Sequence, residues 1–167
     1  MKPENTCCFF GHRETQETPC LTDFLTKTIR HLITEHGVNV FLFGSKSNFD
    51  ALCLKVVSSL KEQYPQISRI YVRSHFPEID RRYEDYLLNF YDNTYFPQKI
   101  RSAGKFSYVE RNREMINSSK YCVVYYDETR FLASSSRKSG THLAYEYALQ
   151  KKLHVTNAFL VENHIIN

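Results

Sequence analysis

The chain has 167 residues and a formal net charge of +4, with 42% hydrophobic and 24% charged residues. These values are typical of a soluble protein of one domain that buries its own core. No stretch approaches the roughly 18 apolar residues that cross a bilayer, and residues 1–6 are too polar to begin a secretion signal, so we expect a cytoplasmic protein without membrane contact.

The cysteines and histidines indicate neither a disulfide framework nor a metal site. The five cysteines are odd in number and lack a CxxC spacing. Four of them fall in apolar stretches, where cysteine acts as a small hydrophobic residue: Cys7, Cys8, Cys53 and Cys122. The seven histidines show no HExxH motif or other paired spacing. We therefore expect reduced thiols, no metal and no required cofactor.

The first part of the chain alternates apolar strands with amphipathic helices. Strands are expected at Thr6–Phe10, Val38–Phe43 and Ile67–Val72, with helices over about 24–33 and 49–60 from their three- and four-residue apolar spacing. Thr22 or Asp23 is expected to cap the first helix, and Gly37 to end it. Because the links are short, this order implies right-handed crossovers and a parallel sheet.

Residues 74–107 interrupt this alternation with an aromatic-rich insert. A short amphipathic helix is expected around Tyr83–Tyr91, and Asp92–Pro97 is expected to be irregular. The simplest interpretation is a cap that packs on the domain. The functional interpretation is that part of the insert covers a ligand and offers rings for base stacking, and the two are compatible.

Regular alternation then resumes. A helix over Tyr108–Ser118, a strand at Tyr121–Tyr126, a polar loop over Asp127–Ser139, a helix over Thr141–Lys152 and a strand at Leu153–Thr156 are expected in this order. The residues that follow give no clear signal. The sequence thus predicts an α/β fold formed by one domain over residues 1–167, with a three-layer Rossmann-like parallel sheet of about five strands.

Two loops that directly follow strands carry residues suited to an anionic ligand. In an open parallel sheet, ligands bind beyond the carboxyl ends of the strands. Gly11, His12 and Arg13 follow the first strand, where glycine permits close backbone approach and arginine offers a planar fork. The second loop is small and polar and precedes a helix; its candidate ligand-binding residues are Gly44, Ser45, Asn48 and Asp50. Plain turns, with Asp50 only a helix cap, are the alternative.

The third candidate loop is Lys138–Thr141, before the last long helix. Ser139, Gly140 and Thr141 combine a flexible glycine, hydroxyl groups and a helix N-terminus, which favours an anion. The sequence lacks the GxxxxGK(S/T) spacing of a P-loop and the GxGxxG fingerprint of dinucleotide dehydrogenases. Each loop is a weak signal by itself, and the three together predict one ligand site at one edge of the sheet.

Four short motifs, taken in order, resemble those of the SLOG superfamily, which includes the Smf/DprA and LOG proteins. They are Phe9–Arg13, Gly44–Asp50, Arg111–Ile116 and Ser139–Thr141. The sequence is most similar to the small single-domain YpsA-like branch, whose function is unassigned, over roughly residues 6–156. The resemblance implies a Rossmann-like sheet that binds nucleotides or nucleotide derivatives.

The LOG branch cleaves the N-glycosidic bond of nucleoside monophosphates, and this sequence departs from its signature. In the RKxxM part, Arg111 matches and Asn112 replaces the lysine. The second part, PGGxGTxxE, lacks the Pro-Gly-Gly here, and its glutamate position holds Ala144. The nearest carboxylate, Glu146, is two residues further along a helix, a rotation of roughly 200°, so we expect it to face away. This departure weakens the hydrolase hypothesis.

Three functions follow from these observations. The leading hypothesis is a sensing or binding module for a nucleotide such as AMP, ADP-ribose or NAD, in which Arg111 and Asn112 join the three loops and Tyr95 or Phe96 covers the base.

The alternative is an N-glycosidic hydrolase, with Arg111, Asp50 and Glu146 as candidate catalytic residues and Glu110 as a substitute carboxylate. A third is single-stranded nucleic acid binding, which the net charge permits but which no concentrated basic patch supports, so nucleic acid is not the expected partner. Self-association is left open.

Overall fold

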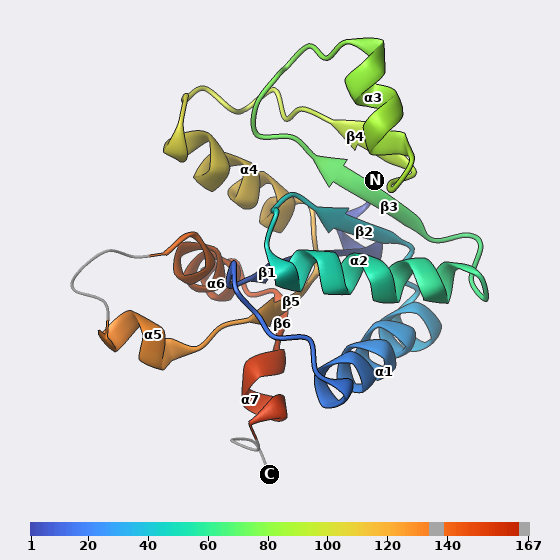
Figure 1. Cartoon of the computed structure of the whole chain (residues 1–167), viewed down its shortest axis with the longest axis vertical. Coiled ribbons are helices and arrows are strands. Elements are labelled where there is room, and N and C mark those ends of the chain that lie inside the picture. Colours follow the sequence, from blue (N-terminus) through green and yellow to red (C-terminus); the bar gives the residue numbers. More distant parts are fainter. Residues whose placement is uncertain (134–138, 164–167) are drawn as a thin grey trace.

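Six parallel strands form one sheet in the order β4-β3-β2-β1-β5-β6 (Figure 1). The strands are β1 (Thr6–Gly11), β2 (Val40–Phe43), β3 (Ser68–Val72), β4 (Asn93–Tyr95), β5 (Tyr121–Tyr125) and β6 (His154–Asn157). In this computed structural model, residues 1–133 and 139–163 are described. The chain starts in the middle of the sheet, moves outward to β4 and then returns to the other side of β1, so the order reverses between β1 and β5.

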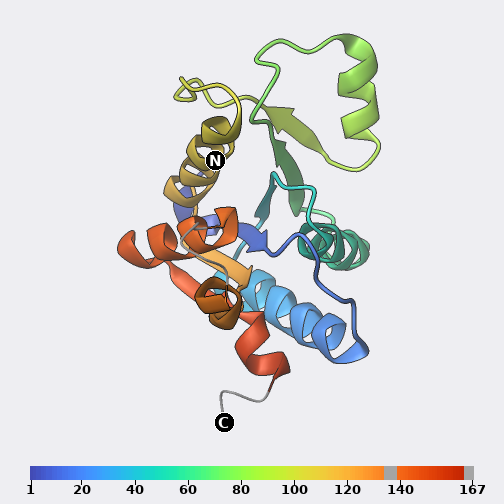
Figure 2. The ribbon, with the colours of Figure 1, turned by 60° about the vertical axis from the view of Figure 1, so that its left-hand side comes forward.

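Helices cover both faces of the sheet, which gives the expected three layers (Figure 2). They are α1 (Pro19–His36), α2 (Asn48–Lys61), α3 (Arg81–Leu88), α4 (Lys105–Asn117), α5 (Glu128–Ala133), α6 (Gly140–Gln150) and α7 (Ala158–Glu162), after a single turn of 3-10 helix at Pro3–Asn5. The Rossmann-like α/β fold predicted from the sequence is therefore confirmed. Among the described residues, none of these helices combines the length and the apolar character needed to cross a membrane.

The core has two halves, one on each side of the sheet. On one face, α1 and α2 pack on the strands through fully buried side chains such as Phe9, Phe41 and Phe49. On the other face, α4 and α6 bury Met115, Ile116 and small residues that allow close approach, such as Ala144 and Ala148. Four of the five cysteines are buried and Cys20 is exposed, as the apolar environments in the sequence indicated.

The predicted number of about five strands was too low. The additional strand, β4, lies in the segment that was expected to be irregular, and it pairs with β3 through Ile70 opposite Asn93 and Val72 opposite Tyr95. Thr94 reinforces this pairing, since its hydroxyl donates to the carbonyl oxygen of Tyr71 at 2.9 Å. A strand of three residues is too short to show a two-residue alternation, so the pattern carried no signal.

Other boundaries differ for local reasons. Thr18 caps α1, rather than Thr22 or Asp23, because its hydroxyl accepts from the Leu21 amide and Pro19 occupies the first turn. Gly37 ends that helix as predicted, with a left-handed φ of 64°. The expected loop over Asp127–Ser139 contains the short helix α5, and residues 134–138 of that loop lie outside the described part of the chain.

Candidate functional site

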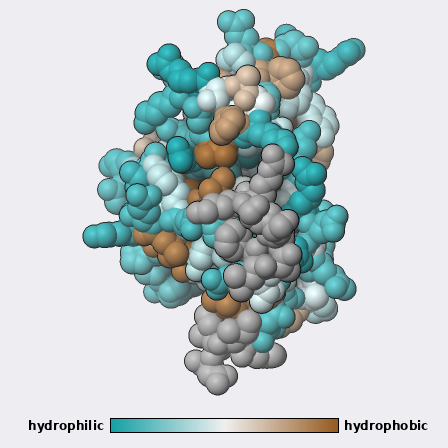
Figure 3. All heavy atoms as spheres, turned by 90° about the vertical axis from the view of Figure 1, so that its left-hand side faces the viewer, coloured by the Kyte–Doolittle hydropathy of each residue, from teal (hydrophilic) through white to brown (hydrophobic). Residues whose placement is uncertain are grey.

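A cleft of about 640 Å³ lies at the carboxyl edge of the sheet. The ends of β1, β2 and β3 form its base, and α3, α4 and α6 border it. Figure 3 shows this side of the molecule, where hydrophobic residues are visible within a recess bordered by hydrophilic ones. The lining residues are Phe10–Arg13, Gly44–Ser47, Tyr71, Arg73–Phe76, Tyr83, Tyr108, Arg111, Asn112 and Ser139–Thr141.

The structure brings ten of the twelve candidate ligand-binding residues to this cleft. These ten are Gly11, His12, Arg13, Gly44, Ser45, Arg111, Asn112, Ser139, Gly140 and Thr141. Asn48 and Asp50 are not among the lining residues. Asn48 is the first residue of α2, and its amide donates to the carbonyl oxygen of Arg13 at 2.9 Å, which fixes the first two loops against each other.

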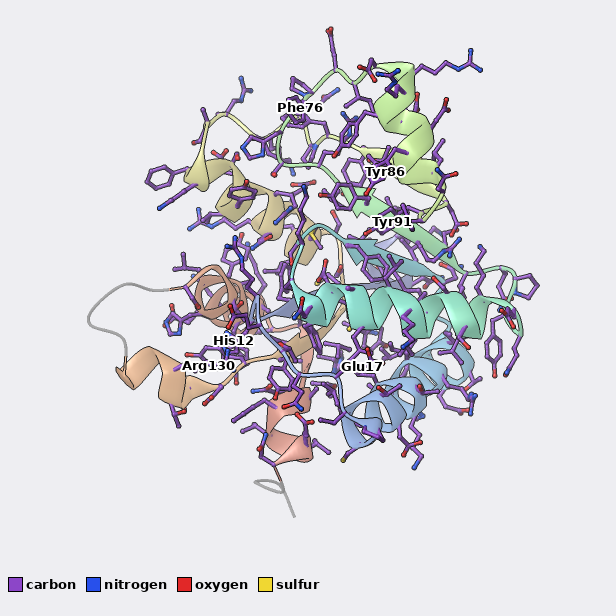
Figure 4. All side chains as sticks on the ribbon, in the orientation of Figure 1. His12, Glu17, Phe76, Tyr86, Tyr91 and Arg130 are labelled. Atoms are coloured by element: carbon purple, nitrogen blue, oxygen red, sulfur yellow. The ribbon has the colours of Figure 1, made fainter. Side chains whose placement is uncertain are left out.

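His12 joins the first loop to the residues that follow β5. Its Nε2 accepts a hydrogen bond from the amide of Asp127 at 2.9 Å, so the neutral ring carries its proton on Nδ1. The pKa of His12 is lowered, first by burial and then by the positive charge of Arg130. A neutral His12 is therefore part of the cleft wall at neutral pH, and Figure 4 shows His12 and Arg130 close together near α5.

Asp50 organises the second loop from below the cleft surface. The Asp50 side chain is only 3% exposed, and its Oδ2 accepts from the amides of Gly44 at 3.2 Å and Ser45 at 2.9 Å. Ser47 caps α2 by accepting from the Asp50 amide at 3.1 Å. Asp50 thus holds the loop from beneath and is not among the residues that line the cleft.

Arg111 holds the same loop from the other side. Its Nη1 donates to the carbonyl oxygen of Gly44, and its Nε donates to the side chain of Asn112 at 3.0 Å. The Arg111 side chain packs so closely that a Cβ on Gly44 would lie 2.7 Å from its Cδ and 2.9 Å from its Nε. Burial lowers the pKa of Arg111, although a guanidinium still remains charged at neutral pH. Arg111 therefore places one positive charge at the floor of the cleft.

The third loop closes the cleft beside β1. Ser139 caps α6 by accepting from the amide of His142 at 3.1 Å. The Thr141 hydroxyl donates to the carbonyl oxygen of Gly11 at 2.9 Å, which ties the start of α6 to the end of β1. A Cβ on Gly140 would meet no described atom within 4 Å, so the space above this glycine is open. Lys138 lies outside the described residues.

The three candidate catalytic carboxylates lie away from the cleft surface. Glu146 is half exposed on α6, where it pairs with His142 Nε2 at 3.1 Å. Glu110 accepts from the amides of Arg101 and Ser102 at 3.0 and 2.9 Å. With Asp50 buried under the second loop, no Asp or Glu lines the cleft among the residues that the structure describes.

Sequence reasoning missed the loop after β3. Arg73, Ser74, His75 and Phe76 follow this strand and line the cleft, and Tyr83 and Tyr108 join them from α3 and α4. Ligands bind beyond the carboxyl ends of parallel strands, and applying this rule to β3 as well as to β1 and β2 would have identified the loop. Tyr95 and Phe96, the rings expected to cover a base, are not lining residues.

Within residues 1–133 and 139–163, no group of three or more His, Cys, Asp or Glu side chains has an arrangement that could hold a metal ion. The described lining of the cleft includes arginines, a lysine, hydroxyl groups and aromatic rings. One end, formed by the three loops, is suited to an anion. The other end, at β3, is aromatic.

Comparisons with known proteins agree with this fold. A model described as the YspA SLOG family matches residues 3–163. Among solved structures, DNA processing protein A from Helicobacter pylori, reported with its single-stranded DNA binding mode, is similar with a TM-score of 0.56 and 14% identity, over 98% of this chain and 74% of that one. No curated protein sequence matches the chain. At such low identity the structural likeness concerns the fold alone.

Proposed function

The chain belongs to the YspA SLOG family, and we propose that it is a binding or sensing module for a nucleotide or a nucleotide-derived small molecule such as AMP, ADP-ribose or NAD. The observation that carries this proposal is the two-ended cleft, in which three loops with residues suited to an anion lie beside a row of aromatic side chains. A phosphorylated nucleoside has the same two-ended chemistry, with an anion at one end and a flat heterocycle at the other.

The anionic group would bind at the three-loop end. Two helices, α2 and α6, begin there, and the backbone amides at helix N-termini favour negative charge. Arg13 and Lys46 line this end and add two positive charges, and Arg111 adds a third from the floor. The Ser45 hydroxyl, which donates to Ser47 at 2.8 Å, keeps the second loop in a compact turn.

Binding without cleavage is favoured over N-glycosidic hydrolysis. Hydrolysis of such a bond proceeds through a cationic transition state, which glycosidases stabilise with carboxylates close to the sugar. Asp50 is covered by the second loop, and Glu146 and Glu110 lie outside the cleft. The described lining residues therefore supply cations and hydroxyls where a hydrolase would need a carboxylate.

Ligand titration tests the proposal. AMP, ADP-ribose and NAD are titrated into the protein by calorimetry, and at least one is expected to bind and to raise the melting temperature. Arg13→Ala is expected to weaken binding by roughly tenfold, because a charge-assisted hydrogen bond is lost. Arg30→Ala is the matched control, since Arg30 is an exposed arginine on α1 away from the cleft.

Two results would contradict this proposal. The first is the absence of binding or of thermal stabilisation with every nucleotide. The second is the release of free base or nicotinamide, detected by chromatography after incubation with nucleoside monophosphates or NAD, which would support the hydrolase instead.

Single-stranded nucleic acid is the second candidate ligand, because aromatic side chains are exposed next to the cleft. Phe76, Tyr86 and Phe90 are 64%, 57% and 48% exposed, and stacking on rings is one way in which proteins bind unpaired bases. The surrounding α3 segment carries Glu84 and Asp85 as well as two arginines, which does not favour a polyanion. Oligonucleotide affinity that exceeds mononucleotide affinity and falls steeply with salt would favour this alternative.

A further inference from the structure

Four rings form a continuous row along the β3 end of the cleft, from α3 to α4. The ring centroids of Tyr83 and Phe76 are 6.1 Å apart, those of Phe76 and His75 are 6.3 Å apart, and those of His75 and Tyr108 are 4.9 Å apart. Phe76 and Tyr108 are 64% and 47% exposed although both line the cleft. Apolar ring surface is thus presented to a ligand here instead of being buried in the core.

The backbone at Phe76 is strained. Its φ is 58°, in the left-handed region that residues with a Cβ rarely adopt. The conformation is held by Arg73, whose Nη1 donates to the carbonyl oxygens of Phe76 and Pro77. Such strain persists where the surroundings enforce it, and it is concentrated at ligand sites. Here it accompanies an exposed ring among the lining residues of the cleft.

Arg73 also has one hydrogen-bond donor, its Nε, that has no partner among the described residues. The residue is 9% exposed and lines the cleft, and its Nε is buried without a hydrogen-bond partner among the described residues. A buried donor without a partner is unfavourable, so sites with such a group are candidates for an external acceptor. Ser74 and His75 bond to each other at 2.9 Å, and the Arg111 guanidinium lies 5.6 Å from the centre of the Tyr108 ring, so Arg73 and Arg111 both place positive charge beside the row.

We propose that the β3 end of the cleft is a nucleobase pocket, in which a purine stacks on the ring row and Arg73 donates to an acceptor on the purine edge. This inference rests on the proposed function and adds the base class to it. Adenine and guanine share the N7 acceptor, and a two-ring base covers more of the row than a pyrimidine does. Figure 4 separates the two ends, with Phe76 near α3 and His12 near α5.

Comparison of whole nucleotides with a ligand that lacks the base tests the pocket. Ribose 5-phosphate, AMP, GMP, CMP and UMP are titrated by calorimetry. AMP and GMP are expected to bind at least about tenfold more tightly than ribose 5-phosphate, because stacking on aromatic side chains is worth roughly that factor per base or more. The affinities of CMP and UMP are expected to lie between that of ribose 5-phosphate and those of AMP and GMP.

Variants of the ring row sharpen the test. Phe76→Ala and Tyr108→Ala are each expected to weaken AMP binding by roughly tenfold and to leave ribose 5-phosphate unchanged. Phe106→Ala is the matched control, since Phe106 is 73% exposed on the same helix as Tyr108 and does not line the cleft. Arg73→Lys keeps a charge but lacks the Nε donor, and it should reduce the preference for purines.

The outcomes separate the two proposals. If ribose 5-phosphate binds as tightly as AMP and Phe76→Ala changes neither, the base pocket is wrong while the anion site stands. Equal affinity for purine and pyrimidine nucleotides would overturn the purine preference. If none of the five ligands binds, the base pocket is wrong. If ADP-ribose and NAD also fail to bind, the proposed function is wrong as well.

Discussion

At the scale of single residues, two buried charges give the cleft its shape. Asp50 accepts from the amides of Gly44 and Ser45, and Arg111 donates to the carbonyl oxygen of Gly44, so the loop is held on both sides. Both side chains are buried, and each forms hydrogen bonds to backbone groups of the loop, which offset part of the cost of removing a charge from water. The loop after β2 is therefore preorganised, and a ligand need not order it on binding.

Phe76 provides a test of backbone strain that is separate from ligand binding. Phe76→Gly and Phe76→Ala both remove the exposed ring, but only glycine adopts a φ of 58° without a Cβ penalty. We expect the glycine variant to be more stable than the alanine variant by about 1 kcal/mol. Urea unfolding of both variants measures this difference, and an alanine variant of equal or greater stability would contradict it.

At the scale of elements, Gly11 and Gly140 differ in how closely neighbouring atoms pack around them. A Cβ on Gly11 would lie 2.4 Å from Phe49 of α2, whose ring is fully buried, whereas a Cβ on Gly140 would meet no described atom within 4 Å. Gly11 is thus required for packing between β1 and α2. Gly140 is under no such packing constraint from the described residues.

This contrast gives a paired prediction. Gly11→Ala is expected to destabilise the protein by roughly 2 kcal/mol or more, because a buried ring must move to admit the methyl group. Gly140→Ala is expected to change the free energy of unfolding by less than about 0.5 kcal/mol, yet to weaken nucleotide binding if phosphate approaches the start of α6. Equal stability of the two variants in urea titrations would contradict the packing argument.

The elements that the sequence predicted best are those with long apolar patterns. The helix with Leu25, Ile29 and Leu32 on one face and the apolar strand ending at Phe43 were both expected, and their buried side chains follow the pattern. β4 and α5 were missed, since three and six residues are too few to show a period. The spacing of apolar residues therefore predicts the helices and strands that form the three layers. Short elements such as β4 depend instead on contacts with residues distant in sequence.

At the scale of the whole molecule, the candidate site was predictable because parallel strands end at one edge. Gly11, Gly44 and Gly140 meet around one cleft, as their positions after strands and before helices indicated. What the sequence did not predict is the position of Asp50 beneath the second loop and the contribution of the loop after β3 to the cleft. Asp50 was expected among the ligand-binding residues, but hydrogen bonds to the loop hold it beneath the cleft surface, and such pairings arise only in the folded chain.

The stability of the whole molecule should depend on pH through Asp50. Burial raises the pKa of Asp50 from 3.8 to about 6, although hydrogen bonds from the Ser45 and Gly44 amides and the charge of Arg111 partly oppose this shift. Between about pH 4 and about pH 6, the folded protein retains a proton that the unfolded chain releases. The free energy of unfolding contributed by Asp50 is therefore largest below pH 4 and is lost as the pH rises through 6.

Asp50→Asn isolates this contribution, because asparagine does not titrate. The stability of the native protein minus that of the variant is expected to fall by on the order of 2 kcal/mol between pH 4 and pH 7, measured by urea unfolding at each pH. His12, whose pKa is lowered by burial, contributes a slope of the opposite sign, but it is present in both proteins and cancels in the difference. Parallel profiles for the two proteins would mean that Asp50 titrates as it does in the unfolded chain. In that case the hydrogen bonds from the Ser45 and Gly44 amides and the charge of Arg111 would offset the effect of burial in full.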